Sequence, residues 1–230
     1  MKLQKTAIAC SILAAISSTN VTAEEAPEAH QLSANIAITT DYVWRGISQT
    51  DNDPAIQGGF DYAHSSGLYA GTWASNVEFG AGDDSHIEID LYGGFTNEFN
   101  GISYDVGIIH YDYPSESVNN FEEVYIGFGY SIFSIKVSHT DDNFAESDDA
   151  TYYEAGADIA LPKNLNLSLH AAHYDLDAGS EDYNDWKVAL STDFKGFGFE
   201  LAYTDTDLSD SECGSNICDG RGIFTISKSF

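Results

Sequence analysis

Acidic side chains recur at alternate positions of otherwise apolar segments, and these are the residues whose type and spacing could do chemistry. Glu88 and Asp90 alternate with Ile87, Ile89 and Leu91. Carboxylates gathered around an aqueous space concentrate cations and repel anions, and low-dielectric walls strengthen that field. The chemistry of this pattern is therefore electrostatic attraction of ions rather than the making or breaking of bonds.

Covalent catalysis has weaker support, because no nucleophile is placed beside a base. Ser138 and His139 are neighbours, but adjacent residues of a strand point to opposite faces. The sequence has no Gly-x-Ser-x-Gly elbow, and none of its seven His residues forms an i, i+2 pair. We therefore predict no catalytic, cofactor-binding or metal-binding residue and no cofactor. A barrel hydrolase that acts on phospholipid or ester substrates stays a minor alternative.

Two acidic segments offer oxygen ligands at alternate positions, as calcium loops do. They are Asp205 to Asp210 and Asp175 to Gly179. Neither completes the calcium-loop pattern with its distant bidentate Glu, so we interpret them as solvated turns. Divalent ions that bridge an acidic rim to anionic lipid remain an open alternative.

The first 23 residues have the pattern of a secretory signal peptide. Lys2 and Lys5 precede an apolar run at 6–16, and small or polar residues follow up to Ala23. Cleavage there gives an exported chain. We predict the following division: a signal peptide at 1–23, a short N-terminal periplasmic segment at 24–32 and an outer-membrane barrel at 33–230.

Two cysteines remain after this cleavage. Cys213 and Cys218 lie five residues apart, and in an exported chain such a pair is predicted to close a small loop as a disulfide. Cys10 belongs to the signal peptide, and a lipid anchor on it is a minor alternative because few apolar residues precede it.

Composition and charge exclude several classes of protein. The net charge is -28, with 9 Lys and Arg against 37 Asp and Glu, which argues against any surface that binds nucleic acid. No run of 18 apolar residues follows the signal peptide, so helical membrane spans are not expected. The Tyr, Phe and Gly content favours strands over helices and is too apolar for disorder.

Period-two alternation runs along almost the whole mature chain and predicts about twelve strands. In the first, Ser33 to Arg45, the face with Tyr42 and Trp44 is apolar and the face with Asp41 and Arg45 is polar. In a segment near 67–77, both faces carry apolar residues and their assignment is ambiguous. The other strands are expected near residues 54–63, 86–95, 101–111, 121–130, 131–140, 150–161, 165–175, 186–193, 197–204 and 220–230.

Connections between these segments alternate strictly between long and short. Each long loop follows an odd-numbered strand, and the long loops and their margins carry more than half of the acidic residues. An up-and-down barrel with both termini and the tight turns at one end has this arrangement.

The orientation of the two faces follows from what each would have to bury. A closed soluble barrel would bury either mid-strand ionisable groups or the aromatic face, whereas a membrane barrel places aromatic residues at the two lipid interfaces. The chain ends on Phe230, with Phe224 and Ile226 on the same face, which we predict to form a C-terminal assembly signal. Residues predicted to line the pore are Asp41, Arg45, Glu88, Asp90, Asp105, Lys136, Glu154, Asp158, Lys187 and Glu200.

One block of sequence resembles a known family. Residues 40–62, TDYVWRGISQTDNDPAIQGGFDY, are similar to the opening block of the TorF family of porins, and the pieces GLYAG at 67–71 and EIDLYGG at 88–94 agree with it. The resemblance covers essentially the mature chain. It implies an outer-membrane barrel with porin character. Lys228, two residues before the end, departs from the common aromatic of the assembly signal.

These observations predict a narrow, cation-preferring channel in the bacterial outer membrane for passive diffusion of small hydrophilic solutes. The acidic loops would form an outer vestibule. Expected partners are outer-membrane lipid and lipopolysaccharide, the barrel assembly machinery, and small solutes or cations. Barrels of about eight strands are filled by their own side chains, and barrels of about sixteen or more leave a water channel, so that twelve strands lie between the two. A non-conducting structural barrel is therefore an almost equal alternative. An adhesin or receptor is a minor one.

Overall fold

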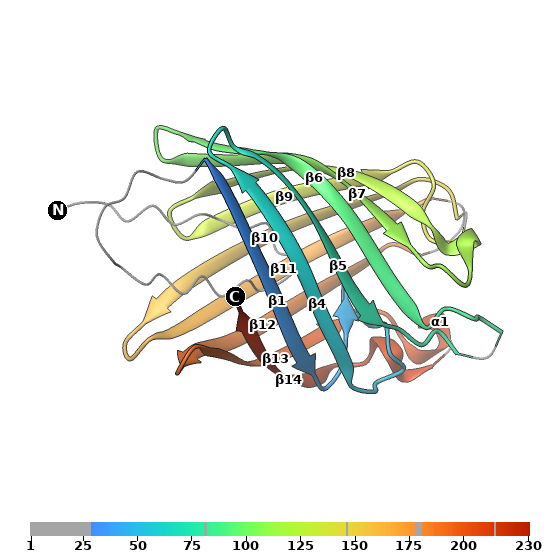
Figure 1. Cartoon of the computed structure of the whole chain (residues 1–230). Helices are drawn as coiled ribbons and strands as arrows, with labels where there is room; N and C mark the ends of the chain where they lie inside the picture. Colours follow the sequence, from blue (N-terminus) through green and yellow to red (C-terminus); the bar gives the residue numbers. More distant parts are fainter. Residues whose placement is uncertain (1–28, 81, 146, 178–180, 214) are drawn as a thin grey trace.

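A closed barrel of antiparallel strands makes up the computed structural model, which describes residues 29–230 except 81, 146, 178–180 and 214 (Figure 1). The predicted fold class is thus confirmed; the predicted signal peptide lies outside the described residues. The barrel strands are β1 His30–Thr39, β4 Ala55–His64, β5 Leu68–Asn76, β6 Ile87–Phe99, β7 Ile102–Asp112, β8 Phe121–Tyr130, β9 Phe133–Thr140, β10 Ala150–Leu161, β11 Leu165–Leu176, β12 Tyr183–Phe194, β13 Phe197–Thr206 and β14 Arg221–Ser229. Shorter elements are β2 Val43–Trp44, β3 Ile47–Ser48, α1 Asp210–Cys213 and the 3-10 helices η1 Ser117–Asn119 and η2 Asn216–Cys218.

Closure is made by the first and last strands. β1 pairs with β4 on one side and with β14 on the other, so that Ala37 lies opposite both Gln57 and Ser227. The terminal residue joins in, since the Phe230 amide donates to the Ala34 carbonyl at 2.9 Å. Every barrel strand therefore has two neighbours, which satisfies the backbone without an open edge.

The faces of the strands are oriented as the sequence predicts. On β6, Ile87 and Leu91 are 41% and 55% exposed on the outer surface, whereas Glu88 and Asp90 point inward and are 2% and 1% exposed. The same alternation places large apolar side chains on the outside of the other barrel strands. An apolar exterior around a polar interior is the arrangement that a lipid environment requires.

Short turns and long loops lie at opposite ends of the barrel, again as predicted. The start of β1 and the end of β14 lie at the end with the short turns, and α1 at the other (Figure 1). In the turn between β6 and β7, Asn100 and Gly101 both have positive φ, at 53° and 80°. That is typical of the type I′ turns that join antiparallel strands tightly.

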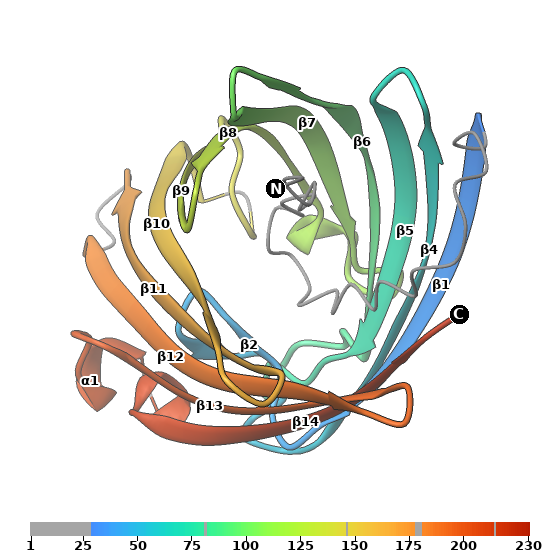
Figure 2. The same ribbon diagram turned by 90° about the vertical axis from the view of Figure 1, so that its left-hand side faces the viewer.

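The first strand differs from the prediction. β1 begins at His30 and ends at Thr39, so it includes part of the predicted segment 24–32 and excludes the residues up to Arg45. Residues 40–54, called here the inserted loop, turn into the barrel, and β2 lies inside the ring of strands (Figure 2). Within the loop, the Asp41 carboxylate accepts hydrogen bonds from Ser48 Oγ at 2.6 Å and Thr50 Oγ1 at 3.0 Å.

Two expectations are corrected by this loop. Tyr42 and Trp44 do not face lipid, since both pack against buried residues inside the barrel. The loop also does not extend an outer vestibule. Alternation continued past Thr39 in the sequence, but the contacts that redirect the chain are made with distant strands.

No helix in the described part of the chain is long and apolar enough to cross a bilayer.

Candidate functional site in the barrel interior

A tight hairpin forms the tip of the inserted loop. β2 and β3 are joined by Arg45 and Gly46, whose φ values are 49° and 80°, as a type I′ turn requires. A Cβ at Gly46 would collide with Thr206 and Asp185 on the barrel wall. Glycine is therefore needed both for its backbone conformation and for the close approach of the hairpin to β12 and β13.

Arg45 anchors the hairpin to the opposite wall. Its Nη2 donates to both oxygens of Glu123 on β8, at 2.5 and 2.8 Å, and the two side chains are 6% and 2% exposed. The guanidinium carbon lies 4.1 Å from the Trp44 ring centre, 4.3 Å from Tyr152 and 4.5 Å from Tyr174. A carboxylate pair made through one guanidinium nitrogen and enclosed by aromatic faces is a strongly desolvated arrangement for an arginine, and its Nη1 has no hydrogen-bond partner among the described residues.

Glu88 binds the inserted loop at a second point. Tyr42 donates its hydroxyl to Glu88 Oε1 at 2.9 Å, and Tyr113 donates to Oε2 at 2.9 Å. The Tyr42 ring meets the Trp73 ring of β5 edge to face at 5.2 Å. The loop therefore contacts β5 and β6 as well as β8.

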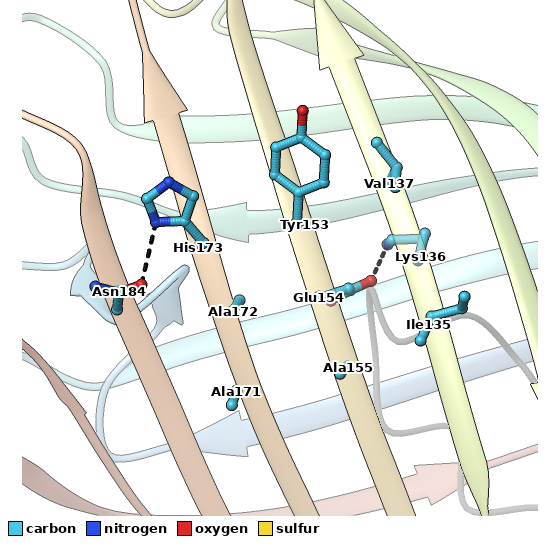
Figure 3. Close-up of a pocket in the computed structure, with 10 residues that line it drawn as sticks. All are labelled: Ile135, Lys136, Val137, Tyr153, Glu154, Ala155, Ala171, Ala172, His173 and Asn184. Carbon is cyan, nitrogen blue, oxygen red and sulfur yellow. Dashed lines mark hydrogen bonds and ion pairs between the residues drawn. The ribbon is translucent and has the colours of Figure 1, made fainter.

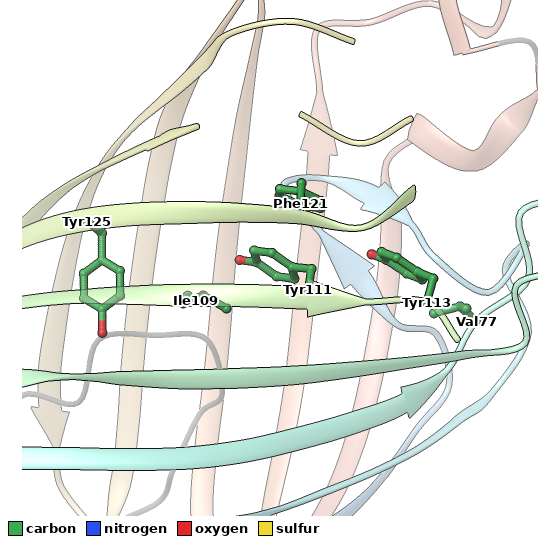
Figure 4. Packing of buried hydrophobic residues seen from close by; sticks show 6 residues of the cluster. All are labelled: Val77, Ile109, Tyr111, Tyr113, Phe121 and Tyr125. Atoms are coloured by element: carbon green, nitrogen blue, oxygen red, sulfur yellow. The ribbon is translucent and has the colours of Figure 1, made fainter. Parts of the chain in front are cut away.

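Aromatic side chains fill the space between these anchors. Tyr111 and Phe121 stack at 4.3 Å between ring centres, and Tyr113 extends from just beyond β7 toward the same side (Figure 4). Trp44 packs edge to face on both Tyr111 and Phe121. The loop-bearing half of the interior is consequently packed, with its buried side chains at 6% exposure or less.

A second polar network lies on the wall formed by β9 to β12. Lys136 Nζ is 2.8 Å from Glu154 Oε1, and His170 lies between Glu154 and Asp185 at 3.8 and 3.2 Å. Tyr152 donates its hydroxyl to Asp185 Oδ2 at 2.8 Å. Charges on this wall are paired, in contrast to an open ring of like charge.

Toward the end with the short turns, the inward side chains are more exposed. Asp158 accepts a hydrogen bond from Ser168 Oγ at 2.5 Å, and Lys187 Nζ lies 3.7 Å from Glu200 Oε1, with the lysine 40% exposed. Asp105 accepts from the Tyr69 hydroxyl at 2.7 Å. This half of the interior is the more hydrated one.

The predicted pore-lining residues are all found on the inner side, but they arrive by two routes. Asp41 and Arg45 come from the inserted loop and not from a strand face. Eight come from strands as expected, namely Glu88, Asp90, Asp105, Lys136, Glu154, Asp158, Lys187 and Glu200. Whether they line a conducting path stays a prediction.

Sequence reasoning missed several interior residues that matter. Glu123 is adjacent to Glu122, so the pattern alone did not single out the carboxylate that points inward. Asp185 lies one residue before Trp186, whose outward orientation would have assigned Asp185 to the inner face. The ambiguous strand β5 directs Trp73 inward at 2% exposure and Leu68 outward at 56%.

The last loop, residues 207–220, and the arginine that follows it contact both ends of the inserted loop. Arg221, which follows it, donates to Asp41 Oδ2 at 3.0 Å, to Asn52 Oδ1, and to the Asn216 carbonyl at 2.7 Å. Cys213 and Cys218 of this loop are joined by a disulfide.

The predicted C-terminal signal residues lie on the outer surface. Phe224, Ile226 and Phe230 are 42%, 39% and 75% exposed there. Their part in assembly is untested and stays a prediction.

A shallow depression of about 470 Å³ lies across β9 to β12 (Figure 3). Outward-facing Ile135, Val137 and Tyr153 border it, while Ala155 and Ala171 leave it shallow. Because these side chains belong to the outer face, the depression faces the surroundings of the barrel and not its interior.

Loop carboxylates are stabilised in their charged form where donors converge on them. The pKa of Asp207 lies below its usual value because Asn184 donates both its side-chain and its backbone N–H to it, at 2.6 and 2.7 Å.

In the residues the structure describes, no group of three or more His, Cys, Asp or Glu side chains has the geometry of a metal site.

Comparison with known proteins agrees with the barrel architecture. No curated protein matches the chain. Among solved structures, the KdgM porin superposes with a TM-score of 0.60 at 10% identity, covering 86% of this chain and 99% of that one. A NanC porin structure gives 0.53 at 6% identity, with 86% and 98% covered. At such identities the likeness shows a shared fold, which is that of outer-membrane porins.

A family profile covers most of the chain. It matches residues 23–230 and is described as a bacterial protein of unknown function, Gcw_chp. The match lends no support to the TorF name, although the porin-like fold agrees with what that resemblance implied. The chain belongs to the Gcw_chp family of bacterial proteins.

Proposed function

We propose that this protein is an outer-membrane channel for passive diffusion of small hydrophilic solutes, with a preference for cations. The observation that carries the proposal is the charge of the inner wall, where carboxylates outnumber bases. Such a wall favours cations in a low-dielectric setting. Inward carboxylates on the barrel strands include Asp61, Glu88, Asp90, Asp105, Glu123, Glu154, Asp158, Asp185 and Glu200, against the strand bases Lys136, Lys187 and Arg221; the inserted loop adds Asp41 and Arg45.

The inserted loop sets the narrowest cross-section in this proposal. Its hairpin spans the interior from the Arg45–Glu123 pair on β8 to the close approach of Gly46 to Asp185 and Thr206 on β12 and β13. Solutes would pass beside it, or when it moves. The more exposed carboxylates of the other half, including Asp158 and Glu200, would then concentrate cations before the constriction.

Planar bilayer recordings in a potassium chloride gradient test the proposal. A reversal potential of the sign set by potassium is expected, and E200Q should move it toward zero because one inner-wall charge is lost. E122Q is the matched control, since Glu122 is 64% exposed on the outer face. Equal permeation of potassium and chloride would refute the cation preference.

A non-conducting structural barrel is the second candidate, and the packed half of the interior favours it. The buried Arg45–Glu123 pair and the stacked rings around it leave the inserted loop firmly held. If the wild type carries no current but a variant with residues 42–51 replaced by a short Gly-Ser linker does, the native barrel is closed. If neither protein carries a current, the channel proposal is refuted.

Export and assembly complete the proposal. The chain would be exported by a signal peptide at 1–23 and recognised by the barrel assembly machinery through Phe224, Ile226 and Phe230. It would then contact outer-membrane lipid and lipopolysaccharide. The TorF relationship suggested by residues 40–62 is compatible with this. Cell fractionation tests it, since loss of Phe230 should lower the amount of folded protein in the outer membrane while leaving export intact.

A further inference from the structure

The lysine that departs from the usual assembly signal is held at a fixed place on the outer edge of the barrel. Lys228 points outward from β14, and its Nζ donates to the Gly196 carbonyl, in the turn between β12 and β13, at 2.9 Å. Gly196 has a φ of 74°, and a Cβ there would lie 2.9 Å from Lys228 Nζ. Glycine at this position therefore suits the turn and leaves room for the ammonium group.

A second lysine stands in the same turn, and both ammonium groups lie over phenyl rings. Lys195 Nζ is 5.2 Å from the Phe194 ring centre. Lys228 Nζ is 5.2 Å from the ring centre of Phe197 and 5.8 Å from that of Phe230. These three rings are 61%, 46% and 75% exposed. Aromatic rings with lysines beside them at a strand end are typical of the boundary between lipid tails and headgroups.

Neither ammonium group has a carboxylate partner among the residues that the structure describes. The described lysines that form ion pairs are Lys136, with Glu154, and Lys187, with Glu200, both on the inner wall. In the half of the barrel with the short turns, no Asp or Glu occupies an outward-facing position of β12, β13 or β14. The acidic long loops lie at the opposite end (Figure 1). The anion that these two lysines lack must therefore come from the surroundings of the barrel.

We propose that this turn, with Lys195, Lys228 and their three phenyl rings, binds the phosphate of an anionic phospholipid. The proposal rests on the proposed outer-membrane location, in which the short turns face the periplasm and its phospholipid leaflet. The two ammonium groups supply the positive charge, and the exposed rings lie where the acyl chains begin. Phosphatidylglycerol has a net negative charge, whereas phosphatidylcholine carries a cation that already compensates its own phosphate. Each lysine near an anionic lipid surface raises the affinity about fivefold.

Lipid binding at this edge is separate from conduction through the lumen. The site lies on the outer surface, so a closed barrel would bind the same lipid. A measurement of lipid binding in detergent can therefore succeed or fail whatever the bilayer recordings show.

Native mass spectrometry of the delipidated mature chain in a neutral detergent tests the proposal. The probes are dioleoylphosphatidylglycerol and dioleoylphosphatidylcholine, and the quantity measured is the lipid concentration at which the first adduct is half saturated. The wild type should bind the anionic lipid at least about tenfold more tightly, as two lysines require. K195Q/K228Q should lose this preference, and K195R/K228R should keep it because arginine retains both charges. K163Q, in the turn between β10 and β11, is the matched control and should bind as the wild type does.

Each outcome supports or overturns the site. Folding of every variant is checked by the shift between heated and unheated samples on a gel, and K228Q alone replaces the double variant if the latter does not fold. Equal affinity of the wild type for the two lipids contradicts the proposal. A preference that survives in K195Q/K228Q also contradicts it, and lower accumulation of that variant in the outer membrane would then assign the lysines to the assembly machinery. An equal loss in K163Q would show diffuse attraction to charge, which overturns the site as well.

Discussion

At the residue scale, the interior depends on a few buried charges whose partners come from distant strands. Arg45 and Glu123 are separated by 78 positions, and Tyr183 donates to the Arg45 carbonyl across 138 positions. A buried ion pair adds little net stability compared with an apolar pair, but removal of one partner leaves an unpaired buried charge. The asymmetry between single and double substitutions is therefore diagnostic.

Arg45→Met should destabilise the protein by about 3–5 kcal/mol, because Glu123 would keep its charge with only the Tyr111 hydroxyl as a donor. The double variant R45M/E123Q should be more stable than R45M alone. Urea unfolding in detergent, followed by tryptophan fluorescence, compares the three proteins. Equal losses in the single and the double variant would show that the two side chains are not coupled.

The pH dependence of the loop contact between Asp207 and Asn184 has a defined sign. Because the pKa of Asp207 is lowered in the folded chain, the charged carboxylate stabilises the fold above its unfolded pKa. That contribution is lost as the pH falls through the folded pKa. Thermal midpoints of the wild type and D207N should differ at pH 7 and converge at low pH. D84N, in another long loop, is the control, and a difference that persists at the lowest pH would contradict this.

At the scale of elements, the inserted loop is held by contacts with the last loop as well as by its own hairpin. Arg221 connects Asp41 and Asn52, near the two ends of the inserted loop, to the Asn216 carbonyl of η2. Thr206 in turn donates to the Cys218 carbonyl at 3.0 Å. The Cys213–Cys218 disulfide closes the segment that carries η2. By lowering the conformational entropy of the unfolded chain, a closure of this length raises the free energy of the unfolded state by about 2 kcal/mol.

Arg221→Gln should loosen the inserted loop while leaving the barrel closed, because the barrel ladders do not depend on this side chain. Limited proteolysis should cut the loop at least about tenfold faster, as expected for the loss of a partly buried ion pair. Reduction of the disulfide should act in the same direction. K195Q, in a short turn at the other end, is the control for the loss of a positive charge. Unchanged cleavage in R221Q would mean that the hairpin contacts alone hold the loop.

At the scale of the whole molecule, the three tryptophans report which side of the wall faces lipid. Trp186 is 41% exposed on the outer surface, whereas Trp73 is 2% exposed on the inner face and Trp44 packs in the interior. Lipid contact should therefore distinguish one tryptophan from the other two.

Reconstitution in bilayers of brominated lipid measures this. Quenching should be strong in the W44F/W73F variant, which retains Trp186, and weak in W186F, because bromine acts only at close range in the hydrocarbon. Circular dichroism verifies that both variants keep the strand content of the wild type. Similar quenching in the two proteins would contradict the orientation of the wall.

The sequence alone was sufficient for the wall of the barrel. Period-two alternation is a local property, so it assigned Glu88 inward and Leu91 outward, and the alternation of loop lengths placed the termini at the end with the short turns. Where both faces are apolar, as around Trp73, the local pattern has no preferred answer. In the structure, Trp73 lies on the inner face, where its ring packs against Tyr42.

Only the tertiary structure decided what occupies the interior. Alternation continued through Tyr42 and Trp44 and predicted a longer strand, yet the chain turns inward at Thr39 because its partners are Glu123 on β8, the rings of β10 and β11, and Arg221 at 180 positions' distance from Asp41. Such contacts leave no periodic trace in a single sequence. Local side-chain alternation therefore determined which surface meets lipid, while the folding of a loop into the lumen depended on pairings that exist only once the barrel has closed.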